Sequence, residues 1–251
     1  MSSNASVFRL NKASRLTLRA GATLIIDGDH CILVDSGYFD TTAELNATLQ
    51  QQAQLNISDI TDVYYTHLHY DHYRPTIFEN TQLQFHIPQI EFQFVNELMK
   101  HRQNEQRFSA FLQETHELIS PVFLRQFLCL ANDPRYMLDT IADRNKIHLC
   151  QPEEQLTDHV KTIDLSGHCP GQLGLEIETE NGVGIVAGDA VISMSDFLAS
   201  DTQHHLIVHN RKKLLLSRQK VAQADFVIPG HGDWFKPKDN TPITFRRGFD
   251  E

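Results

Sequence analysis

The sequence predicts an α/β fold in which two β-sheets are covered by helices. Strand-like segments dominate the first part of the chain, a helical and Phe-rich region follows, and strands then return before a last helix and strand. An order of this kind favours stacked layers around shared hydrophobic cores. The 251 residues are 41% hydrophobic, enough for a large core, and no repeat or Pro/Gly/Ser-rich linker interrupts them. We therefore expect a single domain over residues 1–251.

The first predicted element is a β-hairpin. In the run LTLRAGATLIIDGDHCILVDSG, residues 16–37, branched apolar residues alternate with turn residues, and the Asp-Gly-Asp of residues 27–29 suits the turn. A helical, Phe- and Leu-rich pattern with breaks at Pro121 and Pro134 predicts helices in the middle of the chain. The other predicted elements, in chain order, are a helix over 41–55, a strand over 62–66, a helical insertion over about 88–146, strands over 160–164, 174–178 and 183–187, a helix over 209–223 and a strand over 225–228.

The composition limits the classes of protein that the chain can be. Its formal net charge is -10, from 22 Lys and Arg against 32 Asp and Glu, and it has no extended basic arm. Because binding to a phosphate backbone rests on clustered basic residues, we expect no nucleic acid as a partner. No run of about 18 apolar residues and no signal-like stretch occurs, which predicts a cytoplasmic protein without membrane association. Four irregularly spaced cysteines without a CxxC pair predict reduced thiols, and the oligomeric state stays open.

The main functional signal is THLHYDH, residues 66–72, which directly follows a predicted strand. Alternate side chains of an extended segment share a face, so His67 and His69 can point into one site. Asp71 and His72 come where the chain leaves the strand and can face a neighbouring point, which predicts two sites. Imidazole and carboxylate without a set of thiolates are the ligands expected for Zn²⁺, or for Mn, Fe or Co, in a hydrolytic centre.

Three later segments place further candidate residues at predicted strand ends. SGHCPG holds His168 in a loop constrained by Gly and Pro, VAGDA ends a strand at Asp189, and IPGHGD ends another at His231. Each motif alone is weak, because GD and PGHG sequences are common in tight turns. Together with THLHYDH they predict a functional site, since catalytic groups are typically carried on loops at the edge of a rigid scaffold.

Taken in order, the motifs resemble those of the metallo-β-lactamase-fold hydrolases. The matching segments are VDSG, THLHYDH, SGHCPGQLG, VAGDA and IPGHGD. The resemblance covers nearly the whole chain and is greatest to the glyoxalase II and quorum-quenching lactonase branches. It implies a four-layer αβ/βα sandwich with metals at the edge of the two sheets, to which this chain adds the helical insertion.

The resemblance also implies a ligand set and a mechanism. One metal would be held by His67, His69 and His168, the other by Asp71, His72 and His231, and Asp189 would bridge both. The cofactors would be two divalent metal ions, with zinc the first choice and iron, manganese or cobalt as alternatives. About 3.5–4 Å apart, they would lower the pKa of a bridging water, so that hydroxide attacks the carbonyl of a lactone or thioester of a small, partly apolar compound. Asp71 is expected to orient that hydroxide or to relay its proton.

Two departures from these branches leave the substrate open. The residues after His72 are Tyr-Arg-Pro-Thr rather than a Gly-Gly-Asn turn, and no Tyr follows closely after Asp189. A phosphodiesterase or nuclease of the same fold is the second hypothesis, and it would require Lys or Arg side chains that converge on the metals. Only Arg74 lies near the motifs. A non-catalytic metal-binding protein is the third.

The remaining features have simpler interpretations. The Phe-rich insertion is either a hydrophobic lid over the metals or an ordinary core or dimer contact, and the pattern leaves both open. Cys169 is expected to pack rather than to bind metal, because neighbouring side chains rarely point to the same position. The residues expected on the solvated surface are His204, His205, His209, Arg211, Lys212, Lys213, Arg218 and Lys220.

Overall fold

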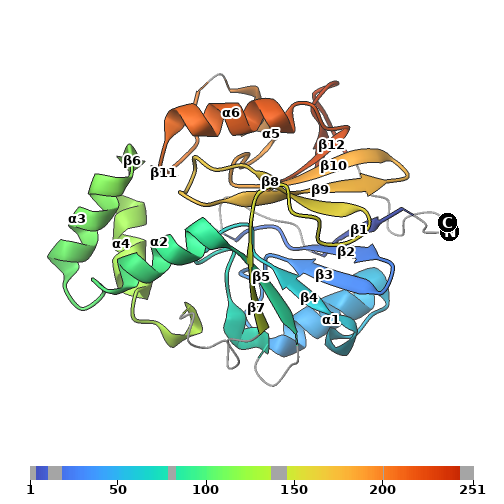
Figure 1. The fold of residues 1–251 in the computed structure, drawn as a ribbon, viewed down its shortest axis with the longest axis horizontal. Helices are drawn as coiled ribbons and strands as arrows, with labels where there is room; N and C mark the ends of the chain where they lie inside the picture. The colour runs from blue at the N-terminus through green and yellow to red at the C-terminus, as the bar shows by residue number, and fades with distance from the viewer. Residues whose placement is uncertain (1–3, 11–18, 79–82, 137–145, 200, 244–251) are drawn as a thin grey trace.

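Two six-stranded sheets form the centre of the structure, a computed structural model that describes residues 4–10, 19–78, 83–136, 146–199 and 201–243. Figure 1 shows them stacked, with helices beyond each sheet. In order across the sheet, the first contains β1 (Ser6–Arg9), β2 (Thr23–Asp27), β3 (His30–Val34), β4 (Asp62–Tyr64), β5 (Gln84–Pro88) and β7 (Ile147–Cys150). The second contains β14 (Thr241–Pro242), β13 (Phe235–Lys236), β12 (Phe226–Pro229), β10 (Gly182–Gly188), β9 (Leu173–Thr179) and β8 (Val160–Asp164).

The helices cover the outer faces of the sheets and form the insertion. They are α1 (Thr42–Ala53), α2 (Gln89–Met99), α3 (Glu105–Thr115), α4 (Pro121–Leu130), α5 (Met194–Leu198) and α6 (Arg211–Val221). Short 3-10 helices are η2 (Ile57–Asp59), η3 (Pro75–Phe78) and η4 (Pro134–Tyr136), and a small separate ladder pairs β6 (Leu118–Ile119) with β11 (Ile207–Val208). None of the helices in the described ranges is long and apolar enough to span a membrane.

Alternation along the strands creates the layers. Leu24 and Leu33 pack with α1 on the outer face of the first sheet, whereas their neighbours Ile25 and Ile32 pack into the space between the two sheets. Successive side chains of a strand point to opposite faces, so a strand buried on both faces must be apolar throughout. A third core lies between the second sheet and α6. The resulting order of helix, sheet, sheet and helix confirms the predicted α/β sandwich.

The insertion has a hydrophobic core of its own. Phe108, Leu112 and Phe127 are buried against one another there, together with residues of α2 and β11. Pro121 marks the first turn of α4, where a missing backbone N–H costs nothing, and the Ser120 side chain accepts a hydrogen bond from the backbone of Phe123. The β6–β11 ladder joins the insertion to the segment that precedes α6 (Figure 1).

Most predicted elements occur within a few residues of their expected bounds, but three strands of the first sheet were missed. β1, β5 and β7 are four or five residues long and carry no turn signal that separates them from their surroundings. β5 and β7 pair with each other and extend the first sheet beyond β4, so the part of the chain that the pattern marked as helical is flanked by strands. Residues 16–18 of the predicted hairpin run and 137–145 of the predicted insertion lie outside the described residues.

Candidate metal centre

Loops at the ends of four strands carry the seven candidate ligands. His67 to His72 follow β4, His168 follows β8, Asp189 follows β10, and His231 follows β12. Hydrogen bonds hold these loops together: the backbone of His231 donates to Ile192 at 2.7 Å. A Cβ atom on Gly230 would clash with Oδ1 of Asp189, so the glycine of the PGHG motif is required by close packing of the two loops.

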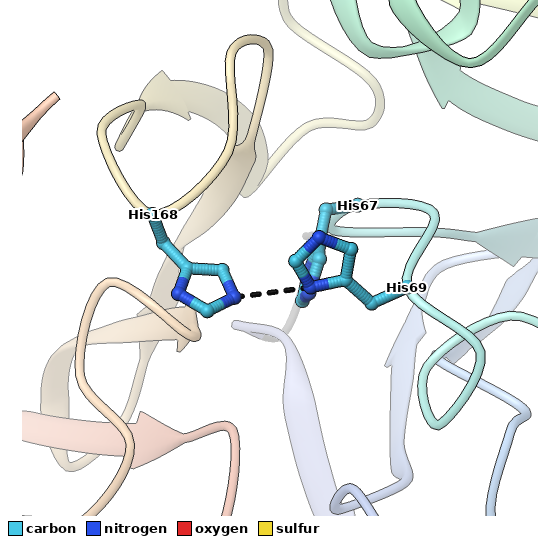
Figure 2. A group of neighbouring side chains, drawn as sticks. All are labelled: His67, His69 and His168. Atoms are coloured by element: carbon cyan, nitrogen blue, oxygen red, sulfur yellow. Dashed lines mark hydrogen bonds between the residues drawn. The ribbon is translucent and has the colours of Figure 1, made fainter. Parts of the chain in front are cut away.

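One group of ligand atoms comes from His67, His69 and His168, which we call the His168 set. Their ligand atoms lie within 4.8 Å of one another, and Nε2 of His168 is 3.1 Å from Nδ1 of His69 (Figure 2). All three side chains are buried. Two nitrogens this close, each able to act as acceptor, can share one cation between them.

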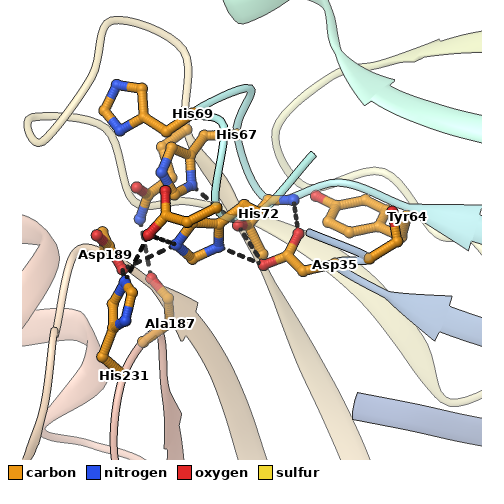
Figure 3. A network of polar contacts seen from close by, with 12 residues as sticks. Asp35, Tyr64, His67, His69, His72, Ala187, Asp189 and His231 are labelled. Atoms are coloured by element: carbon orange, nitrogen blue, oxygen red, sulfur yellow. Dashed lines mark hydrogen bonds and ion pairs between the residues drawn. The ribbon is translucent and has the colours of Figure 1, made fainter. Parts of the chain in front are cut away.

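A second group comes from Asp71, His72 and His231, which we call the Asp71 set. Oδ2 of Asp71 lies 3.0 Å from Nε2 of His231 and 3.9 Å from Nε2 of His72. Asp189 lies between the two sets (Figure 3). Its Oδ1 is 3.2 Å from Nε2 of His72 and 3.5 Å from Nε2 of His231, while its Oδ2 is 3.5 Å from Nε2 of His168.

Three of the five rings are anchored on their far side by an oxygen atom, which fixes the nitrogen that faces the centre. Nδ1 of His72 lies 2.8 Å from a carboxylate oxygen of Asp35, and Nδ1 of His231 lies 3.1 Å from the carbonyl of Arg19. Nδ1 of His67 lies 3.1 Å from the Thr66 hydroxyl, which itself donates to Asp35. In each pair the ring donates its Nδ1–H to the oxygen, so Nε2 is the nitrogen that faces the centre. Asp35 belongs to the VDSG motif, but its role was not apparent from the sequence.

His168 is anchored by a different device, and here a prediction was wrong. His205 was expected on the surface, yet it is buried, and its Nδ1 lies 3.2 Å from Nδ1 of His168. Nε2 of His205 is 3.4 Å from Oδ2 of the buried Asp196, which Arg218 approaches from α6. Arg218 is also buried rather than solvated, because it donates to carbonyls at the end of α5.

The two sets differ in their electrostatics. Burial lowers the pKa of His67 and His69 well below the usual value and that of His168 to about 3. Burial also acts on the rings of the Asp71 set, but Asp189 and Asp71 outweigh it, so the pKa of His231 rises to about 10 and that of His72 well above its usual range. The same rings hold the pKa of Asp189 well below its usual value despite burial.

A buried carboxylate of the insertion connects two of the ligand loops. Glu91, at the start of α2, accepts a hydrogen bond from the backbone of Gly171 at 3.1 Å and one from Leu68 at 3.5 Å. Burial raises the pKa of Glu91. Leu68 itself packs into the first core, opposite to the histidines on either side, as expected from its position. The insertion is therefore part of the support of the centre.

A small cavity of about 50 Å³ lies beside the candidate ligands. Its walls combine four polar residues of the centre with the polar His204 and with four apolar side chains. The nine residues are Asp71, His168, Asp189, His231, His204, Phe123, Ile192, Leu206 and Ile207. The rings of Phe123 and Phe127 both lie 5.4 Å from that of His69. Phe residues of the insertion thus form the core of the insertion, and one of them, Phe123, also lines the cavity.

The donor set suits divalent metal ions. Among the described residues, the buried Nε2 of His67 has no hydrogen-bond partner, and Nε2 of His72 and Oδ1 of Asp189, which face each other at 3.2 Å, make no hydrogen bond either. Burying such atoms is costly unless a bound group compensates them. Neutral imidazoles and carboxylates in this number are the ligands that zinc and related cations take in hydrolytic sites.

Known structures share this fold over nearly the whole length of the chain. Residues 18–74 match the family model described as the metallo-beta-lactamase superfamily. A structure described as a probable metal-dependent hydrolase from Staphylococcus aureus covers 100% of both chains, with 13% identity and a TM-score of 0.65. The chain has the metallo-β-lactamase fold. The fold class and the resemblance inferred from the motifs are thereby confirmed.

Other structures with the metallo-β-lactamase fold include lactonases. AidC, described as a dizinc quorum-quenching lactonase in complex with a product, matches with 19% identity over 92% of this chain and 85% of its own, at a TM-score of 0.61. AiiA of B. thuringiensis, with N-decanoyl-L-homoserine bound at its active site, matches with 13% identity over 92% of this chain and 94% of its own, at a TM-score of 0.56. The comparison with curated proteins gave no match. Two of these structures are thus described as a probable metal-dependent hydrolase and as a lactonase, and at 13% to 19% identity their likeness to this chain is one of fold.

Proposed function

We propose that this chain is a dinuclear metal-dependent hydrolase that cleaves an ester-type carbonyl bond, in a lactone or thioester of a small, partly apolar compound. The observation that carries the proposal is the position of Asp189. Its two carboxylate oxygens face different ligand sets, Oδ1 toward His72 and His231 and Oδ2 toward His168. A carboxylate in this position can bridge two cations, which is the arrangement of two-metal hydrolytic sites.

The seven residues would hold the two ions as two sets joined by Asp189, with zinc as the first candidate. When bound, two divalent ions supply Lewis acidity and activate water at neutral pH. The chain itself supplies geometry: Asp35, the Thr66 hydroxyl and the Arg19 carbonyl orient three of the imidazoles, and His205 orients His168. Such fixed ligands require little reorganisation during the reaction.

Asp71 is the candidate general acid or base. Its carboxylate lines the cavity, and only its Oδ2 lies close to the imidazoles of His231 and His72. The side chain is 15% exposed, whereas that of His72 is fully buried. A carboxylate at the boundary between the ligands and the cavity can accept a proton from water and deliver it to a leaving group.

The cavity favours a carbonyl substrate with an apolar part. Phe123, Ile192 and Leu206 provide an apolar wall opposite the candidate ligands. No Lys or Arg is among the described residues that line it. Arg74, the basic residue nearest to the motifs, points elsewhere: its guanidinium pairs with Asp40 and donates to the Tyr136 hydroxyl at 2.8 Å. A phosphodiester would lack the basic contacts that such substrates usually receive.

A substrate panel tests the proposal. Metal-loaded protein would be assayed against lactones of different acyl length, thioesters, β-lactams and bis-p-nitrophenyl phosphate. We expect turnover of a lactone or thioester that rises with a short apolar acyl chain and disappears in Asp189→Ala. Preferential turnover of the phosphodiester would favour the nuclease hypothesis. Full metal loading without turnover of any ester would indicate a non-catalytic metal-binding protein.

A further inference from the structure

A separate group of metal-binding side chains lies on the first sheet. His86 on β5 and His148 and Cys150 on β7 offer ligand atoms that lie within 4.8 Å of one another. None of these residues belongs to the centre described above, and His86 is far in sequence from His148 and Cys150. Because the group consists of two imidazoles and a thiol, its chemistry also differs from that of the two ligand sets of the centre, which consist of His and Asp side chains.

The register of the sheet brings the three residues together. His86 and His148 are direct partners in the parallel pair of β5 and β7, and Pro88 is the partner of Cys150. Residues two apart on one strand share a face, so Cys150 lies on the same face as His148, and the partner His86 lies beside them. The rings of His86 and His148 are 5.5 Å apart. The arrangement thus follows from backbone pairing rather than from long, adjustable side chains.

Each imidazole is backed by a carboxylate. Nε2 of His86 lies 2.7 Å from Oδ1 of Asp62, and Nε2 of His148 is paired with Glu154. Asp62 is itself held by Thr61 and His30, and Glu154 by the backbone of Gln151. Metal-binding histidines typically donate their second N–H to a carboxylate in this way, which leaves the other ring nitrogen as the ligand.

The ring nitrogen of His86 that does not contact Asp62 faces the Cys150 thiol. This nitrogen, Nδ1, lies 4.0 Å from Sγ of Cys150. Tetrahedral zinc with its usual bond lengths to nitrogen and sulfur separates such a pair by about 3.6 Å, so a shift of a few tenths of an ångström completes the geometry. Cys150 is buried, whereas the His148 side chain is 44% exposed. A cation can therefore enter from the side of His148, and the same side leaves a position for water.

We propose that His86, His148 and Cys150 form a third metal site, which takes Zn²⁺ with water in the fourth position. The bound ion would replace the thiol proton of Cys150, which is released to solvent. Because β7 is the edge strand of the first sheet and its end leads into the loop that carries Glu154, the ion would fix this edge to β5. The site would stabilise the fold and is independent of the proposed hydrolase activity.

Cobalt spectroscopy distinguishes this site from the centre. Chelator-treated protein would be titrated with Co²⁺, and metal content and near-ultraviolet absorption would be followed together. A cysteine thiolate bound to Co²⁺ gives charge-transfer absorption, which imidazole and carboxylate ligands do not. We expect about three ions per chain at saturation, one of them accompanied by this absorption.

Two variants test the ligands, and a third serves as a matched control. Cys150→Ser should abolish the charge-transfer band and remove about one ion per chain. Since Cys150 is buried, His148→Gln provides a second test at an exposed position, and it should weaken binding of the same ion at least tenfold. Cys169→Ser alters the buried thiol beside the His168 set and should leave the band in place.

The outcomes separate this proposal from the proposed function. No charge-transfer band in the intact protein, or a band that survives Cys150→Ser but is lost in Cys169→Ser, would overturn the third site. The His–carboxylate pairs would then be a metal-free polar network. A band with only one bound ion per chain would support the third site and contradict the dinuclear centre instead.

Discussion

The His168 set and the Asp71 set face each other across Asp189, but His168 is supported by different means from the rings of the Asp71 set. The rings of the Asp71 set are anchored by Asp35 and the Arg19 carbonyl, at the edge of the first sheet. His168 depends on a chain of buried side chains, His205 and then Asp196, beside α5. The first support consists of direct contacts to single oxygens, and the second passes through another ring.

The sets also differ in the protonation that the metal-free protein favours. Burial keeps the His168 set neutral, whereas carboxylates raise the pKa of His72 and His231. A cation therefore meets free lone pairs on one side and must displace protons on the other. Two ligand sets of similar composition can therefore differ in metal affinity. Four experiments test this difference between the two sets.

Asp189→Ala should have the largest effect, because this side chain contacts both sets. We expect loss of most of the bound metal and a fall in turnover of about 10³-fold or more, since metal ions contribute several kcal/mol to such transition states. Metal analysis and steady-state kinetics would measure both. Asp239→Ala, at an exposed carboxylate, should change neither. If Asp189→Ala retained both ions, the two sets would not be joined through this residue.

Asp71→Asn should separate metal binding from proton transfer. The amide keeps the shape and one ligand oxygen but loses the charge and the proton acceptor. Turnover should fall by roughly 10²-fold while most of the metal is retained, which is the usual scale of a general acid or base. Elemental analysis and single-turnover kinetics would show this split. Equal losses of metal and activity would limit Asp71 to a ligand role.

His205→Ala should affect the His168 set alone. Removal of the buried ring takes away the partner of His168 Nδ1, and loss of such a support typically lowers metal affinity 10- to 100-fold. Competition with a chelator would measure the affinity of each ion. His204→Ala, one residue earlier and on the cavity wall, is the control and should leave both affinities unchanged. Weakening of both ions by His205→Ala would contradict the separate support of the two sets.

The pH dependence of the metal-free protein should show opposite signs for the two sets. The pKa of His231 is raised to about 10 in the folded state. Its contribution to the free energy of unfolding is therefore complete below the unfolded-state pKa of about 6.5 and is lost as the pH rises toward 10. The pKa of His168 is lowered to about 3 in the folded state. Its contribution to the free energy of unfolding is therefore present above about pH 6.5 and is lost as the pH falls toward 3.

Urea unfolding of chelator-treated protein between pH 4 and 10 would measure this dependence. We expect the alkaline loss of unfolding free energy to shrink in His231→Gln, where only His72 keeps a raised pKa, and to disappear in metal-loaded protein, where neither ring carries a proton that can be lost. An alkaline loss of the same size in His231→Gln would assign it to another group. This effect should be the smallest of the four.

Local sequence predicted much of the fold and all seven candidate ligands. The apolar runs within residues 23–34 suit strands that are buried on both faces, and the Asp-Gly turn fits the hairpin between them. THLHYDH and the three later motifs carry their ligands within short loops at strand ends, where spacing alone limits the possible directions. Chemistry that is encoded within a few consecutive residues can be inferred from those residues.

Tertiary structure decided what depends on pairing between distant segments. β5 and β7 have no pattern that distinguishes them from neighbouring helices, and only their register places His86 beside His148 and Cys150. His205 was expected on the surface because the residues next to it in sequence give no sign of its burial. It is buried by residues distant in sequence, which include Asp196 of α5. Burial and cross-strand contact are properties of the whole chain. The sequence therefore pointed to the seven candidate ligands of the centre, whereas the packing of the layers placed their supporting groups and assembled the group of His86, His148 and Cys150.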